Sequence, residues 1–471
     1  MDKQACDVGV VGLGVMGHAL VLNLAEHGIS VAGYDADQQR ARALAADAPA
    51  DRVCVASSEA ELADLLKAPR CVLMLVPAGP PVDSVLESLT PHLSAGDLVL
   101  DCGNSFYRDT DRRAATLGPK GIGYMGVGVS GGQHGARHGA SLMAGGAREA
   151  YNRVRPVLRA VAATVDGEAC LGYMGAGSAG HYVKMVHNGI EYGLMQLIAE
   201  SYDIMHRGLA MSDQASAAVF ARWNEVELGG YLMEITADIL SRVDAQTGQP
   251  LVDVILGEAG QNYTGMWTWQ DAMALFVPTP TIDAAVVARN LSDLEAERLE
   301  ASRTIVRREM PSIPSRDTLL NDLRGALYAA ELITYAQGMA LIQKASIAHG
   351  YGTSMLEVTR AWRGGCIIRS GVVRLLDEAY STRPDLANPL LHKPFADEVA
   401  QRQERLREVV SQAARMGLPA PAMSASLAYL DGYRSDRLPA NLIQAQRDYF
   451  GAHTYERVDA RGVFHTAWET D

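Results

Sequence analysis

What this sequence lacks excludes several classes of protein. Its 471 residues contain no apolar stretch approaching the roughly 20 residues that a membrane-spanning helix needs. The N-terminal stretch MDKQACDVGVVGLG has neither a charged leader nor a long apolar segment, so we expect no secretory signal. Six cysteines are scattered without a C-x-x-C pair, which argues against a disulfide framework and against a cysteine zinc site. These absences together predict a soluble protein of the cytoplasm.

Positive charge is also scarce. The chain has 42 lysines and arginines against 55 aspartates and glutamates, and its formal net charge is -13. A field of this sign disfavours nucleic acid and anionic membrane surfaces as partners. The content of hydrophobic residues (48%) and of charged residues (21%) is ordinary for a globular protein, and the length suits two or three domains. An anionic substrate would therefore need arginines and lysines gathered around it.

The pattern of apolar residues along the chain changes near residue 178. Before that point, short apolar runs such as CVLMLVP and DLVLDCGNS alternate with amphipathic stretches, which is typical of a parallel sheet wound with helices. After it, long segments with helical periodicity follow one another. We predict an α/β coenzyme domain over residues 1–178 and an all-helical domain over 179–434. Residues 435–471, rich in polar and aromatic residues, are predicted to form a C-terminal tail.

A weak internal echo lies within the helical region. The stretch YGLMQLIAESY from Tyr192 resembles YAQGMALIQKAS from Tyr335, and both are later followed by a tryptophan with glycines, in WNEVELGG and WRGG. A duplicated helical unit would explain this similarity. Shared composition among helices is the alternative, and the sequence leaves both open.

A glycine-rich turn near the N-terminus predicts a dinucleotide site. VGVVGLGVMG places Gly12, Gly14 and Gly17 in G-x-G-x-x-G spacing, directly after an apolar strand and at the start of a helix. Such glycines permit a tight turn, a close approach to a pyrophosphate and close packing of helix on strand. A glycine turn in an unrelated α/β domain is the alternative. Asp35 ends the next strand about 20 residues on, which favours a Rossmann-type site.

The residues after the second strand bear on the choice of coenzyme. A carboxylate at Asp35 can accept hydrogen bonds from a ribose 2′-hydroxyl and repels a 2′-phosphate. Ala36 supplies no cation, and Asp37 adds a second negative charge. We therefore expect NAD to be preferred over NADP. Arg40 and Arg42 on the following helix leave a route to NADP binding, which we expect to be disfavoured.

One predicted helix gathers titratable side chains. In VKMVHNGIEYG, the residues Lys184, His187, Asn188, Glu191 and Tyr192 fall at spacings that place them on one face at about 100° per residue. The amine and the carboxyl would lie about 10 Å apart at 1.5 Å rise per residue. A solvated face with an incidental charge pair is the alternative. Apolar residues continue on that side of the helix, which favours a functional face.

Six motifs carry a resemblance to a known family. GLGVMG, GNSFYRDT, GVSGGQHGARHGASLM, GHYVKMVHNGIEYG, WRGGCIIRS and LPANLIQAQRDYFGAHTYE occur in this order along nearly the whole chain. The sequence resembles the decarboxylating 6-phosphogluconate dehydrogenases. That resemblance implies a Rossmann-type coenzyme domain, a large helical domain built on a duplicated unit, and no metal. It also implies a homodimer in which the tail of each subunit enters the active site of the other.

The resemblance assigns a role to the helical face. Lys184 matches the family's general base, and Glu191 matches its general acid. The family transfers a hydride from C3 of 6-phosphogluconate to the nicotinamide while the lysine takes the proton of the C3 hydroxyl. The β-keto acid then loses carbon dioxide, the lysine protonates the carbonyl oxygen, and the glutamate protonates carbon to give ribulose 5-phosphate. The lysine must start neutral, which burial or nearby positive charge would favour.

Further family positions carry over as binding residues. The expected substrate ligands are Asn104, Ser130, Gly131, Gly132, His187, Asn188, Tyr192, Asn262, Thr264, Arg289, Arg447 and His453. The expected coenzyme ligands are Gly12, Leu13, Gly14, Val15, Met16, Gly17, Asp35, Ala36, Asp37, Val76, Pro77, Ala78 and Asn104. Arg447 and His453 lie in the tail, so the resemblance implies that they come from the partner subunit.

The sequence departs from the family pattern at several places, and two of them bear on the coenzyme and on the substrate. The family usually has Asn-Arg-Thr where this chain has Asp35, Ala36 and Asp37, which strengthens the expectation of NAD. The family usually has lysines where this chain has Asn262 and Met266. One charged hydrogen bond to phosphate is worth about 1.5–3 kcal/mol, or roughly ten- to a hundredfold in affinity. Either 6-phosphogluconate binds more weakly here, or the substrate is a related sugar acid.

The sequence thus predicts an enzyme and leaves alternatives. We expect oxidative decarboxylation of 6-phosphogluconate with NAD. The same chemistry on a non-phosphorylated or altered sugar acid is one alternative, and a non-catalytic paralogue that binds nucleotide or sugar acid is another. The presence of both an acid and a base argues against the second. His134 and His138 form an H-x-x-x-H pair in a glycine-rich segment without an apparent third ligand, so we expect no metal.

Overall fold

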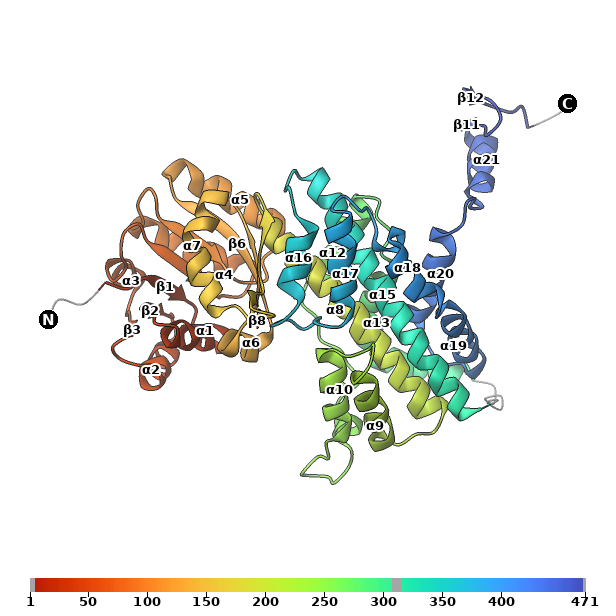
Figure 1. Ribbon diagram of the computed structural model, residues 1–471, viewed down its shortest axis with the longest axis horizontal. Helices are drawn as coiled ribbons and strands as arrows, with labels where there is room; N and C mark the ends of the chain where they lie inside the picture. The colour runs from red at the N-terminus through yellow and green to blue at the C-terminus, as the bar shows by residue number, and fades with distance from the viewer. Residues whose placement is uncertain (1–4, 307–314, 469–471) are drawn as a thin grey trace.

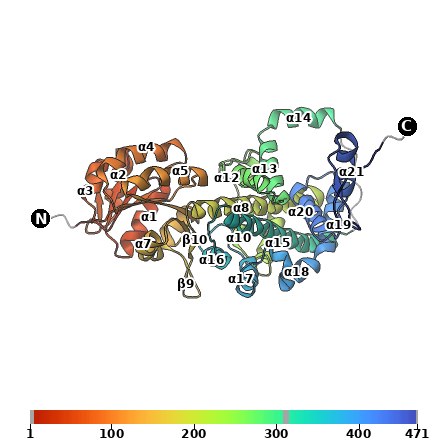
Figure 2. The same cartoon turned by 90° about the horizontal axis from the view of Figure 1, so that it is seen from above.

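The computed structural model describes residues 5–306 and 315–468. A part that contains the main sheet and a helical part lie one after the other along the longest axis, and the C-terminal segment lies beyond the helical part (Figures 1 and 2). This arrangement confirms the expected fold class, an α/β domain followed by a large helical domain. The chain passes from one part to the other between Gly175, where the last strand of the sheet ends, and Ala179, where the first long helix begins.

Among the described residues, eight strands form one sheet in the order β10-β7-β6-β5-β4-β1-β2-β3. The strands are β1 (Val8–Val11), β2 (Val31–Tyr34), β3 (Val53–Val55), β4 (Cys71–Met74), β5 (Leu98–Asp101), β6 (Gly123–Ser130), β7 (Ser141–Gly145) and β10 (Leu171–Gly175). The strands from β3 to β6 are parallel, and β7 is antiparallel to β6. The chain order reverses between β1 and β4, so the turns after these strands open onto one crevice, where ligands bind in such sheets.

Helices cover the sheet, which explains why its strands are almost continuously apolar. They are α1 (Val15–Glu26), α2 (Gln38–Asp47), α3 (Glu59–Asp64), α4 (Pro80–Leu89), α5 (Tyr107–Leu117), α6 (Gly132–His138) and α7 (Arg148–Val161), followed by the hairpin β8 (Thr164–Val165) and β9 (Glu168–Ala169). Side-chain caps begin two of the helices. Asp37 accepts a hydrogen bond from the N–H of Gln39, and Ser58 accepts one from the N–H of Glu61.

Two long helices, α8 (Ala179–Asp203) and α15 (Arg316–Ala348), form the centre of the helical part and run side by side (Figure 2). Around them lie α9 (Asp213–Asn224), α10 (Tyr231–Ser241), α11 (Leu251–Val254), α12 (Thr264–Ala274), α13 (Pro280–Ser292), α14 (Glu295–Thr304), α16 (Met355–Trp362), α17 (Val372–Thr382), α18 (Lys393–Ala400), α19 (Gln403–Met416) and α20 (Pro421–Tyr433). A Cβ on Gly193 would lie 2.6 Å from Thr334, and one on Gly338 would lie 2.5 Å from Ile190. The two helices are therefore antiparallel, and glycine allows their close approach.

The segments of the internal echo lie on these two helices. The tryptophan motif that follows α8 and the one that follows α15 also meet, since Gly230 and Ser370 form an antiparallel bridge. The N–H of Tyr231 donates to the carbonyl of Arg369, and the N–H of Gly371 donates to the carbonyl of Gly229. The segments that follow the two tryptophans are therefore neighbours in the fold.

The C-terminal segment, α21 (Ala440–Gly451), β11 (Tyr455–Glu456) and β12 (Val463–Phe464), folds around one buried carboxylate. Asp448 accepts hydrogen bonds from the N–H of Thr454 at 2.9 Å, from the N–H of Thr466 at 3.1 Å and from the indole of Trp468 at 2.9 Å. The last three residues of the predicted tail lie outside the described residues. Within the described chain, no helix combines the length and the apolar composition needed to cross a membrane.

Candidate active site

The turn between β1 and α1 leaves room for a pyrophosphate. Gly12 has a φ of +93°, and a Cβ there would lie 2.5 Å from the Leu75 carbonyl oxygen. A Cβ on Gly17 would lie 1.8 Å from the Gly12 carbonyl oxygen, so only glycine allows α1 this close to the strand. At Gly14, the nearest atom to a Cβ is Nη1 of Arg40, at 3.7 Å. The open backbone at the N-terminus of α1, which includes Val15, fits a dinucleotide phosphate.

The carboxylate at the end of β2 is already engaged by the protein. Asp35 is 7% exposed, and it accepts hydrogen bonds from the N–H of Leu13 at 2.7 Å and of Asp37 at 2.8 Å. The Arg40 guanidinium lies 3.5 Å from both carboxylates, with 55% of its side chain exposed. Arg40 thus balances the acidic pair and offers a cation beside the glycine turn.

A cavity of about 290 Å³ joins the two parts of the molecule. Its lining comprises Met16, Leu75, Val76, Pro77, Ala78, Cys102, Gly103, Asn104 and Val129 from the sheet-containing part, and Asn262, Tyr263, Thr264 and Trp267 from the start of α12. The expected coenzyme residues at the ends of β4 and β5 therefore face residues expected to bind substrate. This is the junction at which a nicotinamide and a substrate would meet.

Asn104 is carried on a turn that Asp101 holds. The buried Asp101 carboxylate accepts hydrogen bonds from the Ser105 hydroxyl at 2.6 Å and from the Gly103 N–H at 3.1 Å. Arg113, which is also buried, lies 3.7 Å from Asp101. The turn that presents Asn104 to the cavity is thus fixed by buried charges beneath it.

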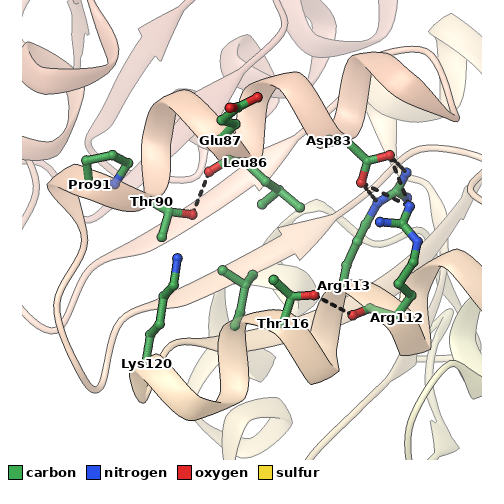
Figure 3. Close-up of a pocket in the computed structure, with 10 residues that line it drawn as sticks. Asp83, Leu86, Glu87, Thr90, Pro91, Arg112, Arg113, Thr116 and Lys120 are labelled. Carbon is green, nitrogen blue, oxygen red and sulfur yellow. Dashed lines mark hydrogen bonds and ion pairs between the residues drawn. The ribbon is translucent and has the colours of Figure 1, made fainter.

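Arg113 also extends to the outer side of the coenzyme domain. Arg113 and its neighbour Arg112 both bind Asp83, in a groove between α4 and α5 (Figure 3). These bonds hold the pKa of Asp83 down, at about 2. Ion pairs to Asp83 therefore fasten α5, which follows the Asn104 turn, to α4.

The amine of Lys184 is buried because α8 packs tightly on β6. A Cβ on Gly128 of β6 would lie 2.3 Å from the Cβ of Lys184, so a larger residue there would displace the lysine. Lys184 is 6% exposed. Burial lowers the pKa of its amine, while the nearby Glu191 carboxyl and Cys366 thiol act in the opposite direction. The site therefore favours the neutral amine that a general base requires.

His187 connects the other titratable groups of the helical face. Its Nδ1 lies 3.7 Å from Oε2 of Glu191 and 3.1 Å from Oδ1 of Asn188, and its Nε2 lies 3.2 Å from the Ser130 hydroxyl. Burial keeps the pKa of His187 well below its ordinary value, so the ring is neutral, and the Lys184 amine adds to this lowering when it is protonated. Burial raises the pKa of Glu191, against the lowering effect of Lys184 and Arg289, which favours a protonated acid.

A second set of side chains extends from this group along α12 and α13. The Asn188 amide donates to the Thr264 hydroxyl at 3.1 Å. The Asn262 side-chain oxygen accepts hydrogen bonds from the Thr264 N–H at 3.1 Å and from the Tyr192 hydroxyl at 3.3 Å. The Arg289 guanidinium carbon lies 3.5 Å from the centre of the Tyr192 ring. A cation, a phenol, an amide and a hydroxyl thus adjoin Glu191.

The expected carboxyl-binding turn follows β6. Gly131 has a φ of +113°, and a Cβ there would lie 2.3 Å from the Gly365 carbonyl oxygen. Gly132 has a φ of +59°, with no atom near the position of its Cβ. Glycine is therefore needed both for the backbone conformation and for the approach of the segment after α16. The turn lies next to Ser130, which contacts His187.

Known proteins match this chain over almost its full length. A family model described as the NAD binding domain of 6-phosphogluconate dehydrogenase matches residues 7–184, and one described as the C-terminal domain of that enzyme matches residues 180–468. The chain belongs to the 6-phosphogluconate dehydrogenase family.

Several relatives and one solved structure illustrate the similarity. The decarboxylating 6-phosphogluconate dehydrogenase of Synechococcus elongatus is 48% identical over 98% of both chains. The NADP(+)-dependent decarboxylating enzyme of Bacillus subtilis is 46% identical, over 99% of this chain and 100% of its own. The 6-phosphogluconate dehydrogenase of Plasmodium falciparum, described with NADP+ and with 6-phosphogluconate, has a TM-score of 0.95 and 41% identity, over 98% of this chain and 100% of that one.

The comparisons contradict one prediction from the sequence. The expected preference for NAD over NADP is wrong, since the Bacillus subtilis member of the 6-phosphogluconate dehydrogenase family is named NADP(+)-dependent and the Plasmodium falciparum member binds NADP+. The expectation treated Asp35 and Asp37 as free negative charges. In the structure Asp35 binds backbone N–H groups, and the exposed Arg40 lies beside both carboxylates.

Two expected substrate ligands lie away from the rest of this family's site. Arg447 and His453 belong to the exposed C-terminal segment, which lies at the opposite end of the molecule from the coenzyme sheet (Figures 1 and 2). The other expected substrate ligands gather around β6, α8, α12 and α13. Supply of Arg447 and His453 by a second copy stays a prediction.

Sequence reasoning gave no role to one wall of the site. Trp362 is fully buried, its ring centre lies 5.7 Å from that of His187, and its indole donates to the sulfur of Met143 at 3.3 Å. Cys366, also fully buried, donates to the Trp362 carbonyl at 3.3 Å and acts on the pKa of Lys184. The sequence signal for both residues is the WRGGC stretch, part of which belongs to the internal echo and all of which belongs to a family motif.

The pair of histidines in the glycine-rich segment lies on a helix. His134 and His138 both belong to α6, where their ring centres are 4.9 Å apart. Over residues 5–306 and 315–468, no group of three or more His, Cys, Asp or Glu side chains could hold a metal ion. The described residues therefore give this pair no further ligand.

Proposed function

We propose that this protein oxidises 6-phosphogluconate at C3 and decarboxylates it to ribulose 5-phosphate, with NADP+ as hydride acceptor. One observation carries the proposal. A buried Lys184 amine and a Glu191 carboxyl occupy one face of α8, and through Asn188 and Thr264 that face adjoins the cavity lined by the coenzyme loops. Burial lowers the pKa of the amine and raises that of the carboxyl, toward the neutral base and the protonated acid that this reaction needs.

The glycine turn fits the coenzyme pyrophosphate, and Arg40 fits a 2′-phosphate. Val76, Pro77, Ala78 and Asn104 would place the nicotinamide against the cavity between the two parts. When bound, the coenzyme supplies the acceptor for the hydride that leaves C3.

The residues of α8 would move the protons. Neutral Lys184 takes the C3 hydroxyl proton as the hydride leaves, which gives a β-keto acid. Loss of carbon dioxide then passes an electron pair toward the C3 carbonyl oxygen, and Lys184 returns its proton to that oxygen. Glu191 then protonates the carbon that held the carboxyl group while Lys184 takes back the proton of the enediol hydroxyl, which gives the ketopentose phosphate. The neutral His187 can hold the substrate hydroxyls without competing for these protons.

The rest of the site would orient the substrate. Ser130, Gly131 and Gly132 would hold its carboxyl end. Tyr192, Thr264 and Arg289 would hold its phosphate end. The half-buried Arg289 lies over the Tyr192 ring and within the field of Glu191, so an anion there would gain a charged hydrogen bond.

Asn262 favours a second candidate substrate class, the non-phosphorylated sugar acids. Its side-chain oxygen is engaged by Tyr192 and Thr264, and it supplies no cation at a position where the family usually has a lysine. A non-phosphorylated sugar acid with the same C1 to C3 groups could use the same acid and base.

Steady-state kinetics tests the proposal. The purified protein should reduce NADP+ with 6-phosphogluconate, with release of carbon dioxide and formation of ribulose 5-phosphate. Gluconate should give a lower kcat/KM because it lacks the group that Arg289 binds. A higher kcat/KM with gluconate would assign the second substrate class. Coenzyme binding without turnover of any sugar acid would support a non-catalytic paralogue.

We also propose that the protein is a homodimer whose tails are exchanged. Leu442, Ile443, Tyr449 and Phe450 of α21 are 58–73% exposed, which is a large apolar surface for a helix that lies apart from the remainder of the chain. Packing of this helix on a second copy would cover that surface. It would also bring Arg447 and His453 to the partner's site.

A further inference from the structure

One buried carboxylate joins three helices that come from both parts of the molecule. Asp271 of α12 is 4% exposed. One of its oxygens accepts a hydrogen bond from the Tyr107 hydroxyl of α5 at 2.6 Å. Its other oxygen accepts one from the Tyr182 hydroxyl of α8 at 2.5 Å. A single carboxylate therefore fastens the coenzyme domain to two helices of the substrate domain.

The surroundings of Asp271 keep this arrangement intact. Nη2 of Arg108 lies 3.7 Å from the carboxylate, and its Nε donates to the Tyr107 hydroxyl at 2.9 Å. Nε2 of His349 lies 4.0 Å from the carboxylate. Burial raises the pKa of Tyr107 to about 12 and that of Tyr182 well above its ordinary value. Both phenols therefore remain protonated donors at neutral pH.

Each of the three helices carries an expected site residue close to this junction. Asn104 precedes Tyr107 by three residues, and Lys184 follows Tyr182 by two. Thr264 lies seven residues before Asp271, about 10 Å along the same face of α12. Asn104 and Thr264 both line the 290 Å³ cavity, the first from the coenzyme domain and the second from α12. The junction thus spans from the nicotinamide wall to the wall that holds the substrate.

The choice of a carboxylate suits this geometry. Its two oxygens can accept from two tyrosines at once, whereas an amide of the same size offers one accepting oxygen. A buried charge is costly, so apolar residues would fasten the helices at least as stably. The bidentate acceptor instead fixes the distance and orientation between α5, α8 and α12.

We propose that Asp271 is a positioning residue that, through Tyr107 and Tyr182, sets the distance between the nicotinamide wall and the helices carrying Lys184 and Thr264. The inference rests on the proposed function, because it assigns Asp271 to the hydride-transfer step of that reaction. Asp271 does not touch the reacting atoms. It acts by keeping two walls from different domains in register.

Three variants of the full-length protein test the proposal, Asp271→Asn, Tyr107→Phe and Tyr182→Phe. A misplacement near 1 Å can slow an enzyme about a hundredfold, so kcat should fall roughly ten- to a hundredfold in Asp271→Asn and less in each phenylalanine variant. The Kd for coenzyme without substrate should stay within about twofold of wild type, since the glycine turn and Arg40 lie in one domain. The deuterium isotope effect with 3-deuterated substrate should rise, because hydride transfer becomes slower.

Tyr429→Phe is the matched control. Tyr429 is also a buried tyrosine, and its hydroxyl accepts a hydrogen bond from Asn388 at 3.0 Å in the helical domain. The Tyr429→Phe variant should be less stable than the wild type, with no change in kcat or in the isotope effect. If Asp271→Asn behaved in the same way, Asp271 would only stabilise the fold and the proposal would be overturned. The two phenylalanine variants decide the matter if Asp271→Asn does not fold.

An activity-independent measurement separates this inference from the proposed function. Amide hydrogen exchange should become faster both in residues 103–107 and in residues 264–268 when Asp271 or either tyrosine is changed. It should stay at the wild-type rate there in Tyr429→Phe. A wild-type protein that does not turn over 6-phosphogluconate counts against the proposed function alone. Unchanged exchange in both segments counts against the positioning role alone.

Discussion

Nδ1 of His187 lies 3.7 Å from Oε2 of Glu191, one turn apart on α8. The same imidazole is close enough to Lys184 for the amine to lower its pKa. A neutral ring therefore lies in contact with the acid and within the field of the base. This arrangement places a proton donor and a proton acceptor on one face of α8, with the imidazole next to the donor.

Replacement of the proposed base should remove catalysis and leave the fold intact. Lys184→Met keeps the length of the side chain and its burial but cannot accept a proton, so kcat should fall by roughly 10²- to 10⁴-fold. Initial-rate kinetics at saturating substrate measures this effect. Lys344→Met is the control, since Lys344 is exposed on α15 and should keep wild-type rates. Retention of more than a tenth of the activity in Lys184→Met would assign proton transfer to another group.

Arg40 should determine the affinity for the 2′-phosphate. Arg40→Ala removes a charged donor beside the glycine turn, so the KM for NADP+ should rise about ten- to a hundredfold, while that for NAD+ changes little. Arg42→Ala, an exposed change on the same helix, should have a much smaller effect. Equal KM values for NADP+ in wild type and Arg40→Ala would remove Arg40 from the coenzyme site.

The coenzyme prediction shows where sequence reasoning reaches its limit. Periodicity and turn residues were sufficient for the strands β1, β2, β4 and β5 and for the glycine turn, because buried parallel strands and tight turns have local signatures. The hydrogen bond that Asp35 accepts from Leu13 joins residues far apart in the sequence and has no such local signature. The sequence does not show which backbone N–H groups bind the Asp35 carboxylate. The prediction therefore gave too much weight to the repulsion between Asp35 and a 2′-phosphate.

The helical face was predictable for a similar reason, and its surroundings were not. Lys184, His187 and Glu191 share a face by spacing alone. Trp362 and Cys366 reach the same site from a segment more than a hundred residues away, and Asp271 reaches its tyrosines from a third helix. No periodicity within one segment reports contacts of that kind. Such residues were visible only through the folded chain.

Arg289 should bind the distal end of the substrate. Arg289→Ala should raise the KM for 6-phosphogluconate about ten- to a hundredfold, with a smaller change in kcat, because a phosphate contact far from C3 contributes mainly to binding. The kcat/KM for gluconate should remain near its wild-type value. Arg374→Ala, an exposed change on α17, is the control. A parallel loss with gluconate would place Arg289 in the fold or in catalysis and not at a phosphate.

Glu331 should make stability depend on pH. Burial raises its pKa from an ordinary 4.5 to about 8. Between these values the folded protein holds a proton that the unfolded chain has lost, so the free energy of unfolding falls as pH rises, by up to about 1.4 kcal/mol per pH unit. Glu331→Gln stays neutral, and its Tm should match wild type near pH 5 and exceed it by several degrees near pH 8.5.

The control for this pH dependence is Glu404→Gln, whose side chain in the wild type is 79% exposed on α19. Its Tm should follow that of the wild type at every pH. A constant offset between Glu331→Gln and wild type from pH 5 to pH 8.5 would mean that Glu331 does not titrate in this range.

Tail exchange can be tested by mixing two inactive variants. Lys184→Met removes the base from the body of a subunit, and Arg447→Ala weakens the contribution of its tail. In a mixed dimer with exchanged tails, one site combines an intact body with an intact tail from the other subunit. Co-expression should then restore about a quarter of the wild-type activity at low substrate, because about half of randomly paired dimers are mixed and each has one complete site. If each tail served its own subunit, both sites of every mixed dimer would be damaged and the mixture would stay as inactive as its parents.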